Sequence, residues 1–231
     1  MKNEQEWSLE FDLLYQNITS NQAPGLTEYE KSVFLTRAQE AVVVMLYNGS
    51  MKRSFEETEE FTSYLNTLVC QEDCARAQSD APKVFSNSQV FELPEDLLFR
   101  TLEMCRISVD GCGEMDAVVV PVTQDEVWRT SRNPFKKQNG NRVLRLSYGA
   151  SDRLAGSLYE SNYSELISDH EIARYTVRYI KKPEPIILVD LSEEGHSVNG
   201  ETAPKTCKLP EHLHQTILME AVKAAKAVWM S

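Results

Sequence analysis

Hydrophobic positions in the first third of the chain recur with the spacing of amphipathic helices. Capping signals predict helix starts at Ser8, at Thr27, which has a glutamate three residues later, and at Ser54. Breaking residues at 21–25 and at 48–49 predict where the first two helices end. These segments together predict a small helical layer.

From about residue 84 the pattern changes to short runs rich in β-branched and aromatic residues, separated by Pro, Gly and Asn. The predicted strands are residues 90–93, 97–109, 117–122, 143–148, 172–180 and 186–191. A second capping box at Thr123 predicts one short helix that ends at Asn133. Two prolines near the end of Tyr175–Leu188 predict a projecting hairpin there.

The last segment returns to helical spacing after Pro210, which suits a first helical turn. Its expected inward stripe consists of Leu213, Ile217, Ala221, Ala224 and Val228. Helices, then strands, then a helix predict an α+β fold, in which N-terminal helices and a C-terminal helix form a layer and an antiparallel β-sheet is inserted. We expect a helical domain of residues 1–80 with 208–231, and a β-rich insertion of residues 84–206.

The composition is that of a globular protein, with 231 residues, of which 42% are hydrophobic and 26% are charged. The 24 basic and 35 acidic residues give a net charge of -11, which argues against a protein that wraps DNA with its whole surface. No apolar run is long enough to span a bilayer and the first residues are polar, so we expect a soluble protein made in a cytoplasm, without membrane contact. The five cysteines, an odd number, are expected to be free thiols.

The charge is unevenly distributed along the chain. Residues 1–80 hold 6 basic and 14 acidic side chains, a net of -8, whereas residues 129–153 hold 7 basic and 1 acidic, a net of +6. Such segments can meet head to tail between copies and build a ring or a filament, although a solvated basic loop or a nucleic-acid patch would also have this composition. The candidate interface residues are Arg129, Arg132, Lys136, Lys137, Arg142 and Arg145, with Tyr175, Tyr179, Lys181 and Lys182 of the predicted hairpin and Trp229 near the C-terminus.

Patterns typical of catalysis, cofactor binding and metal binding are missing from the sequence. The segment Gly111–Gly113 lacks the third glycine of a dinucleotide loop, and no Gly-Lys-Ser/Thr triplet occurs. The cysteines lack the paired spacing of a zinc site, and His212 and His214 would point to different faces of a helix. No nucleophile elbow is present. We therefore expect no enzyme activity, no cofactor and no metal.

Several stretches, taken together, resemble the ring proteins of the neck and tail of crAss-like bacteriophages. Residues 11–18, 21–26 and 28–39 are similar to the opening helix pair of that family. Four later stretches also resemble sequences of that family: residues 133–136, 143–146, 178–188 and 209–213. The family is itself similar to head-to-tail adaptors and tail tubular proteins of short-tailed phages.

The resemblance implies a structural virion protein, assembled in the cytoplasm of the bacterial host. Twelve identical copies would form a ring below the portal that extends the channel for DNA ejection and connects head to tail. Its expected partners are further copies of itself, the portal and adjacent ring or tail proteins, with DNA passing through without sequence-specific binding. The architecture favours the first ring, next to the portal. A capsid cargo protein and a host-directed adaptor module are the alternatives.

Overall fold

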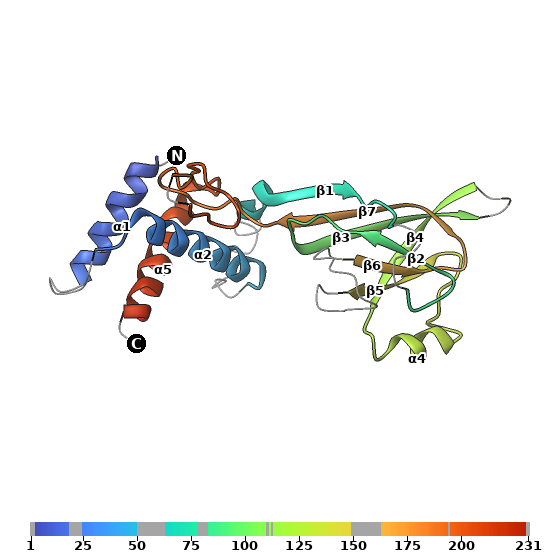
Figure 1. The fold of residues 1–231 in the computed structure, drawn as a ribbon. Coiled ribbons are helices and arrows are strands. Elements are labelled where there is room, and N and C mark those ends of the chain that lie inside the picture. The colour runs from blue at the N-terminus through green and yellow to red at the C-terminus, as the bar shows by residue number, and fades with distance from the viewer. Residues whose placement is uncertain are drawn as a thin grey trace. The chain divides into compact units, whose positions relative to one another are not determined.

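A computed structural model describes residues 3–18, 25–49, 63–77, 83–109, 111, 113–148, 163–193 and 195–229 (Figure 1). The chain divides into two compact units, which we call the helical unit (residues 1–68 with 182–231) and the sheet unit (residues 69–181). Helices and a large curled sheet confirm the α+β class. The chain passes from the helical unit to the sheet unit between residues 68 and 69, and returns between residues 181 and 182. The sequence analysis places these two boundaries at residues 80–84 and 206–208. Among the described helices none is long and apolar enough to cross a membrane.

The helical unit contains α1 (Glu4–Ile18), α2 (Glu28–Tyr47) and α5 (Glu211–Trp229). The start predicted at Ser8 is wrong, because α1 begins four residues earlier with a capping box between Asn3 and Glu6. The predicted box at Thr27 and the stop at Asn48 are confirmed, and Gly49 adopts the positive φ of 68° that favours glycine after a helix.

α1 is anchored to α2 and to α5. The Lys31 ammonium of α2, 4% exposed, donates to Asp12 at 2.7 Å and to the Ser8 hydroxyl of α1 at 3.1 Å. The Trp7 ring lies 5.0 Å from the His214 ring of α5. The buried ring contact and the ion pair of Lys31 together hold α1 at a defined position on α2 and α5.

The C-terminal helix begins directly after Pro210, as predicted, but its buried stripe is different near the end. Leu213, Ile217 and Ala221 are buried, whereas Ala224 and Val228 are exposed. The buried face continues instead through Leu218, Val222 and Ala225. At 3.6 residues per turn Ala224 and Val228 fall on the same side of the helix as Leu213 and Ile217, so the difference lies in the packing around the last turns and not in the helical period.

The predicted hairpin of Tyr175–Leu188 does not form, and neither does the predicted strand 186–191. Residues 184–188 instead run along α2, where polar side chains at helical spacing replace strand partners. The Thr36 hydroxyl accepts from the Ile186 amide at 3.1 Å, the Ser32 hydroxyl accepts from the Leu188 amide at 3.0 Å, and the Gln39 amide donates to the Glu184 carbonyl at 3.1 Å. One bridge, from Ile187 to Lys205, is all the strand pairing this segment makes among the described residues.

The third predicted helix, after Ser54, lies largely outside the described residues. The described part resumes at Ser63 with a short helical turn, and η1 (Asn66–Leu68) then leads into the sheet unit. Leu65 and Leu68 are buried.

The sheet unit has seven described strands in the order β1-β7-β3-β4-β5-β6-β2. Their bounds are β1 (Val69–Asp73), β2 (Ser88–Glu92), β3 (Leu97–Val109), β4 (Gly113–Val122), β5 (Arg142–Tyr148), β6 (Tyr163–Ile167) and β7 (Glu171–Lys181). The predicted purely antiparallel sheet is wrong for one pair, because β4 and β5 are parallel. The connection between them carries the predicted short helix, α4 (Val127–Arg132), and lets β5 run in the same direction as β4. The capping box predicted at Thr123 is wrong, because α4 begins after Glu126 without a side-chain cap.

The sheet curls until its two edges meet (Figure 1). Residues that follow β1 pair with β2: the Ala77 amide donates to the Val90 carbonyl, and the Glu92 amide donates to the Ala75 carbonyl. The enclosed core includes Phe91, Ile107, Val143, Leu166 and Tyr175. Closure in this way leaves fewer strand edges open to unwanted pairing.

One split interrupts the curled sheet between β3 and β4. These strands pair only from Cys105 opposite Ala117 to Val109 opposite Gly113, at the hairpin end. From Val118 onward β4 pairs with β5, while β3 continues along β7 as far as Leu97. Residues 97–104 of β3 therefore have strand pairing on one edge only, among the residues that the structure describes.

Candidate interaction surfaces

The first candidate surface is built around α4. Val127 anchors this helix because its side chain is 1% exposed and packs with Leu144, Leu146 and Ile167. The Trp128 ring lies 4.5 Å from the Phe85 ring and remains 50% exposed. The six-residue helix thus buries one apolar side chain and turns its remaining surface outward.

A buried carboxylate fixes the loop that carries Phe85. Glu165 is fully buried, and its side chain accepts hydrogen bonds from the amides of Val84 and Phe85, each at 3.0 Å, and from the Ser88 hydroxyl. Charge-assisted bonds of this kind are stronger than neutral ones. The support beneath Trp128 is therefore rigid.

The turn that follows α4 holds an aromatic ring in solvent. The Phe135 amide donates to the Asn133 side chain at 2.9 Å, and the Arg142 guanidinium donates to the Phe135 carbonyl at 2.8 Å. The Phe135 side chain is nevertheless 87% exposed. A phenylalanine that is exposed on a backbone held by hydrogen bonds is typical of an interaction site, because an exposed aromatic ring gains much by burial and the backbone needs little ordering on binding.

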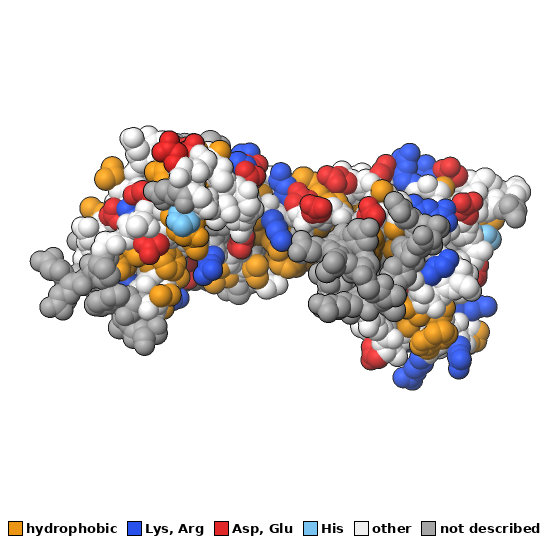
Figure 2. Space-filling view, in the orientation of Figure 1, with side chains coloured by type: hydrophobic (Ala, Val, Ile, Leu, Met, Phe, Trp, Pro, Cys, Tyr) orange, Lys and Arg blue, Asp and Glu red, His pale blue; other side chains and the backbone are white. Residues whose placement is uncertain are grey.

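Cationic side chains surround these rings. We define the basic–aromatic surface as the exposed residues Trp128, Arg129, Arg132, Phe135, Lys136 and Lys137. Figure 2 shows basic side chains beside an apolar patch in this part of the sheet unit. An open hollow of about 720 Å3 lies between α4 and the Asn133–Phe135 turn. Aromatic and arginine side chains are the types enriched in protein interfaces.

The structure separates the predicted interface residues into groups. Four of the six basic ones lie on the basic–aromatic surface, and Arg142 lies behind it, bonded to Phe135. Tyr175 and Tyr179 are 1% and 0% exposed, so they belong to the core of the sheet unit and not to a surface. Lys181 is half-buried, Lys182 is exposed, and the side chain of Trp229 lies outside the described part of the structure.

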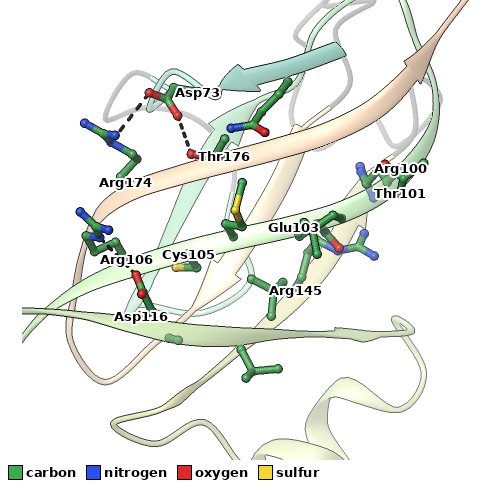
Figure 3. A pocket seen from close by; sticks show the side chains of 16 residues that line it. Asp73, Arg100, Thr101, Glu103, Cys105, Arg106, Asp116, Arg145, Arg174 and Thr176 are labelled. Atoms are coloured by element: carbon green, nitrogen blue, oxygen red, sulfur yellow. Dashed lines mark hydrogen bonds and ion pairs between the residues drawn. The ribbon is translucent and has the colours of Figure 1, made fainter. Parts of the chain in front are cut away.

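Arg145 belongs to a second candidate surface, a groove of about 880 Å3 at the split between β3 and β4 (Figure 3). Arg100, Glu103 and Arg145 lie at one end of this groove, and Asp73, Arg106 and Arg174 lie at the other. Its lining also includes Leu102 and Met104, which are 49% and 38% exposed. The groove thus offers both apolar contact and charge.

At the second end each arginine has its own carboxylates. The Arg106 guanidinium lies 3.2 Å from Asp116 and 3.7 Å from Glu114, and Arg174 lies 3.8 Å from Asp73. All of these side chains are about half exposed or more, so the pairs are surface ion pairs that contribute little to stability.

At the first end two arginines lie near one carboxylate. Glu103, 13% exposed, lies 2.9 Å from the Arg145 guanidinium, which is 11% exposed, and also accepts a hydrogen bond from the Tyr175 hydroxyl. Burial, together with the charge of Glu103, raises the pKa of Tyr175, so its hydroxyl stays a donor. The Arg100 guanidinium bonds the hydroxyls of Ser147 at 3.0 Å and Ser164 at 3.2 Å.

Burial lowers the pKa of Arg100, and the nearby positive charge of Arg145 lowers it further. The sequence analysis missed Arg100 and Glu103, and it placed Arg145 with the α4 loop. No spacing in the sequence could have joined Arg145 to Arg100 and Glu103, because β5 and β3 are separated in the chain by β4 and α4 and come together only through the curl of the sheet.

The described residues contain no group of three or more His, Cys, Asp or Glu side chains that could hold a metal ion. His214 is buried and bonds the Leu209 carbonyl at 2.9 Å, and the His196 ring stacks on Tyr29. Burial raises the pKa of Cys74 and of Cys105 to about 12, and that of Cys207 to about 11, so these thiols are unreactive at neutral pH.

A protein with a rigid exposed aromatic patch, a charged groove and segregated charge has the features of an assembly component. The chain belongs to the phage tail ring protein 3/4 family, whose pattern it matches over residues 1–230. It is 37% identical over 206 residues to "Ring protein 3" of Bacteroides phage crAss001, an alignment that covers 87% of this chain and 84% of the relative. It is also 32% identical over 234 residues to "Ring protein 4/5" of the same phage, covering 98% and 93%. The resemblance to crAss-like phage ring proteins is confirmed.

Proposed function

We propose that this protein is a non-enzymatic virion component that associates with copies of itself to form one closed ring of a phage tail. The observation that carries the proposal is the match to a tail ring protein family along nearly the whole chain. Two relatives named as ring proteins support it, each aligned over more than four fifths of both lengths. The copy number that we propose is twelve, with assembly in the cytoplasm of the bacterial host.

A ring of identical copies needs two unlike surfaces on each copy, because each subunit meets its neighbour head to tail. The basic–aromatic surface is one such surface. Its counterpart is the helical unit of the next copy, which holds 10 basic and 18 acidic residues, a net of -8. Complementary charge steers such encounters and fixes their orientation, while Phe135 and Trp128 supply apolar contact.

The ring surrounds the path of the phage DNA in this proposal, and it joins the portal or an adjacent ring in the connection between head and tail. The net charge of -11 is consistent with this role, because a channel with few phosphate contacts lets a duplex slide. A position directly next to the portal stays a prediction. The numbered names of the relatives, 3 and 4/5, favour a place within a series of several tail rings.

Charge reversal of the basic–aromatic surface tests the proposed contact. The double variant Arg129→Glu with Arg132→Glu changes the net charge by four units at exposed positions. The matched control, Arg76→Glu with Arg178→Glu, changes it equally at exposed side chains of the sheet unit that line neither the α4 hollow nor the β3–β4 groove. We expect mass photometry, with and without the portal protein of the same phage, to show rings for the wild type and the control and subunits for the Arg129/Arg132 variant.

The alternatives give different results in the same measurement. A capsid cargo protein would show a variable population without a fixed copy number. A host-directed adaptor would stay monomeric or dimeric whether or not the portal is present. Rings that form equally well in both double variants would remove the basic–aromatic surface from the proposed interface while leaving the ring itself in place.

A further inference from the structure

Positive charge exceeds negative charge at the end of the β3–β4 groove that holds Arg100, Glu103 and Arg145. Arg145 lies 2.9 Å from Glu103, both side chains being less than 15% exposed, and the half-buried Arg100 lines the same end of the groove, near enough to feel the charge of both. A buried cation is costly unless a partner charge and hydrogen bonds compensate for it. One negative charge is therefore missing at this point, among the residues that the structure describes.

The contacts of Arg100 show where the negative charge is missing. Its two terminal nitrogens bond neutral hydroxyls, and its buried Nε has no hydrogen-bond partner in the described part of the chain. Glu103 already receives the Arg145 guanidinium and the Tyr175 hydroxyl. Guanidinium groups bind carboxylates with short, charge-assisted bonds, so an incoming carboxylate is the ligand that this end of the groove suits.

The rest of the groove suits an extended chain. Residues 97–104 of β3 have strand pairing on one edge only within the described structure, and the groove runs along Arg100–Arg106 of that strand. Its volume of about 880 Å3 is that of a site for a short peptide segment. Leu102 and Met104 offer apolar contact beside the open edge. An added strand satisfies backbone groups, while side-chain contacts give specificity.

We propose that this groove binds an extended acidic segment of a neighbouring copy of the chain, with one carboxylate between Arg100 and Arg145. The inference rests on the proposed ring, because it supplies that ring with a second contact in addition to the basic–aromatic surface. The bound segment completes the charge balance that the single chain leaves open.

A carboxylate from a second copy fits better than a phosphate of DNA. The Arg145 side chain is 11% exposed and lies inside the groove, where the backbone of a rigid duplex does not reach. The chain carries 35 acidic residues and a net charge of -11, so copies offer many carboxylates while the surface as a whole repels phosphates.

Photo-crosslinking in the full-length protein tests the occupant directly. A photoreactive amino acid replaces Leu102, which lines the groove and is 49% exposed, and a control carries it at Val189, 38% exposed in the helical unit. In assembled rings we expect the Leu102 probe to crosslink a second copy, at a peptide that contains Asp or Glu. Rings in which this probe crosslinks nothing, or crosslinks added duplex DNA, would overturn the inference.

A pair of variants gives the second readout. We expect Arg100→Gln to raise the protein concentration at half-assembly about tenfold, as the loss of one charge-assisted contact would. Arg174→Gln, at the balanced end of the groove, should leave that concentration within about twofold. Equal effects of the two variants would contradict the inference.

The failure of the inference and the failure of the proposed function are distinguishable. If the wild type forms rings but the Leu102 probe and the Arg100→Gln variant show no effect, the groove is empty and the ring stands. If the wild type forms no ring under any condition, the proposed function fails, and the inference fails with it.

Discussion

The two units of the molecule each bury a basic side chain, and they compensate it differently. In the helical unit Lys31 lies 2.7 Å from Asp12 and 2.9 Å from Glu28. Burial alone would lower the pKa of Lys31, but the hydrogen bonds and charges of these two carboxylates outweigh burial and raise it. In the sheet unit Arg145 pairs with Glu103, whereas burial and the charge of Arg145 lower the pKa of the neighbouring Arg100.

The difference separates a contact that serves folding from one that is incomplete without a partner. Lys31 has more negative charge around it than it needs, so its site is satisfied within a single chain. The arginine pair has less negative charge around it, so binding an anion would stabilise the sheet unit. Ring subunits need such a division, because they must fold before they meet and must still gain free energy when they do.

The largest effect is expected at Glu103. We predict that Glu103→Gln lowers the free energy of unfolding by about 3 kcal/mol, because it leaves the largely buried Arg145 without its carboxylate and removes a nearby negative charge from Arg100. Urea unfolding followed by circular dichroism measures this change. Asp116→Asn, at a side chain that is 85% exposed, is the control and should cost less than about 0.5 kcal/mol. Equal losses would mean that Arg145 and Arg100 are well hydrated.

The corresponding change in the helical unit should be smaller. We predict that Lys31→Met costs about 2 kcal/mol, because Asp12 and Glu28 lose their partner but remain partly hydrated. Lys223→Met, at a position that is 76% exposed, should change the free energy of unfolding by less than about 0.5 kcal/mol. If Lys31→Met costs more than Glu103→Gln, the comparison between the units is reversed.

The cap of α2 gives a still smaller effect, restricted to one helix end. The Thr27 hydroxyl accepts from the Glu30 amide, and Thr27→Ala should cost about 1 kcal/mol through the loss of this bond. Thermal unfolding measures it, with Thr67→Ala, an exposed threonine outside α2, as the control. No difference between the two variants would show that the cap contributes nothing.

The weakest effect at neutral pH concerns the buried thiols. Cys105 has a pKa raised from 9.0 to about 12 by burial, so the folded state holds its proton more tightly than the unfolded state. Its contribution to stability is full below pH 9 and decreases as the pH rises from 9 towards 12. We predict a falling free energy of unfolding over that range, and a smaller fall in Cys105→Ala. Identical pH profiles would contradict the shift.

Local signals in the sequence predicted much of the fold. The capping box of Thr27, the stop at Asn48–Gly49, the short helix before Asn133 and five of the strands are confirmed, because each is encoded within a few residues. The strands β1 and β6 were missed. β6 reads Tyr-Ser-Glu-Leu-Ile, in which the buried Glu165 and Ser164 hide the apolar pattern.

The wrong predictions concern segments whose structure is determined by contacts with residues far away in the sequence. Residues 184–188 look like a strand, but their backbone groups are satisfied by Ser32 and Thr36, which lie about 150 positions earlier. The basic–aromatic surface could be predicted because Arg129 to Lys137 are close in sequence. The groove could not be predicted, because its arginine pair is assembled by the curl of the sheet.

Native mass spectrometry of the full-length protein, alone and mixed with the portal protein of the same phage, tests the central claim most directly. The account predicts one discrete assembly whose mass is a fixed multiple of 26.3 kDa, twelve in the proposed ring, with closed rings in electron micrographs of the same sample. A monomer that persists at every concentration and with the portal present, or a continuous series of sizes without closure, would contradict it.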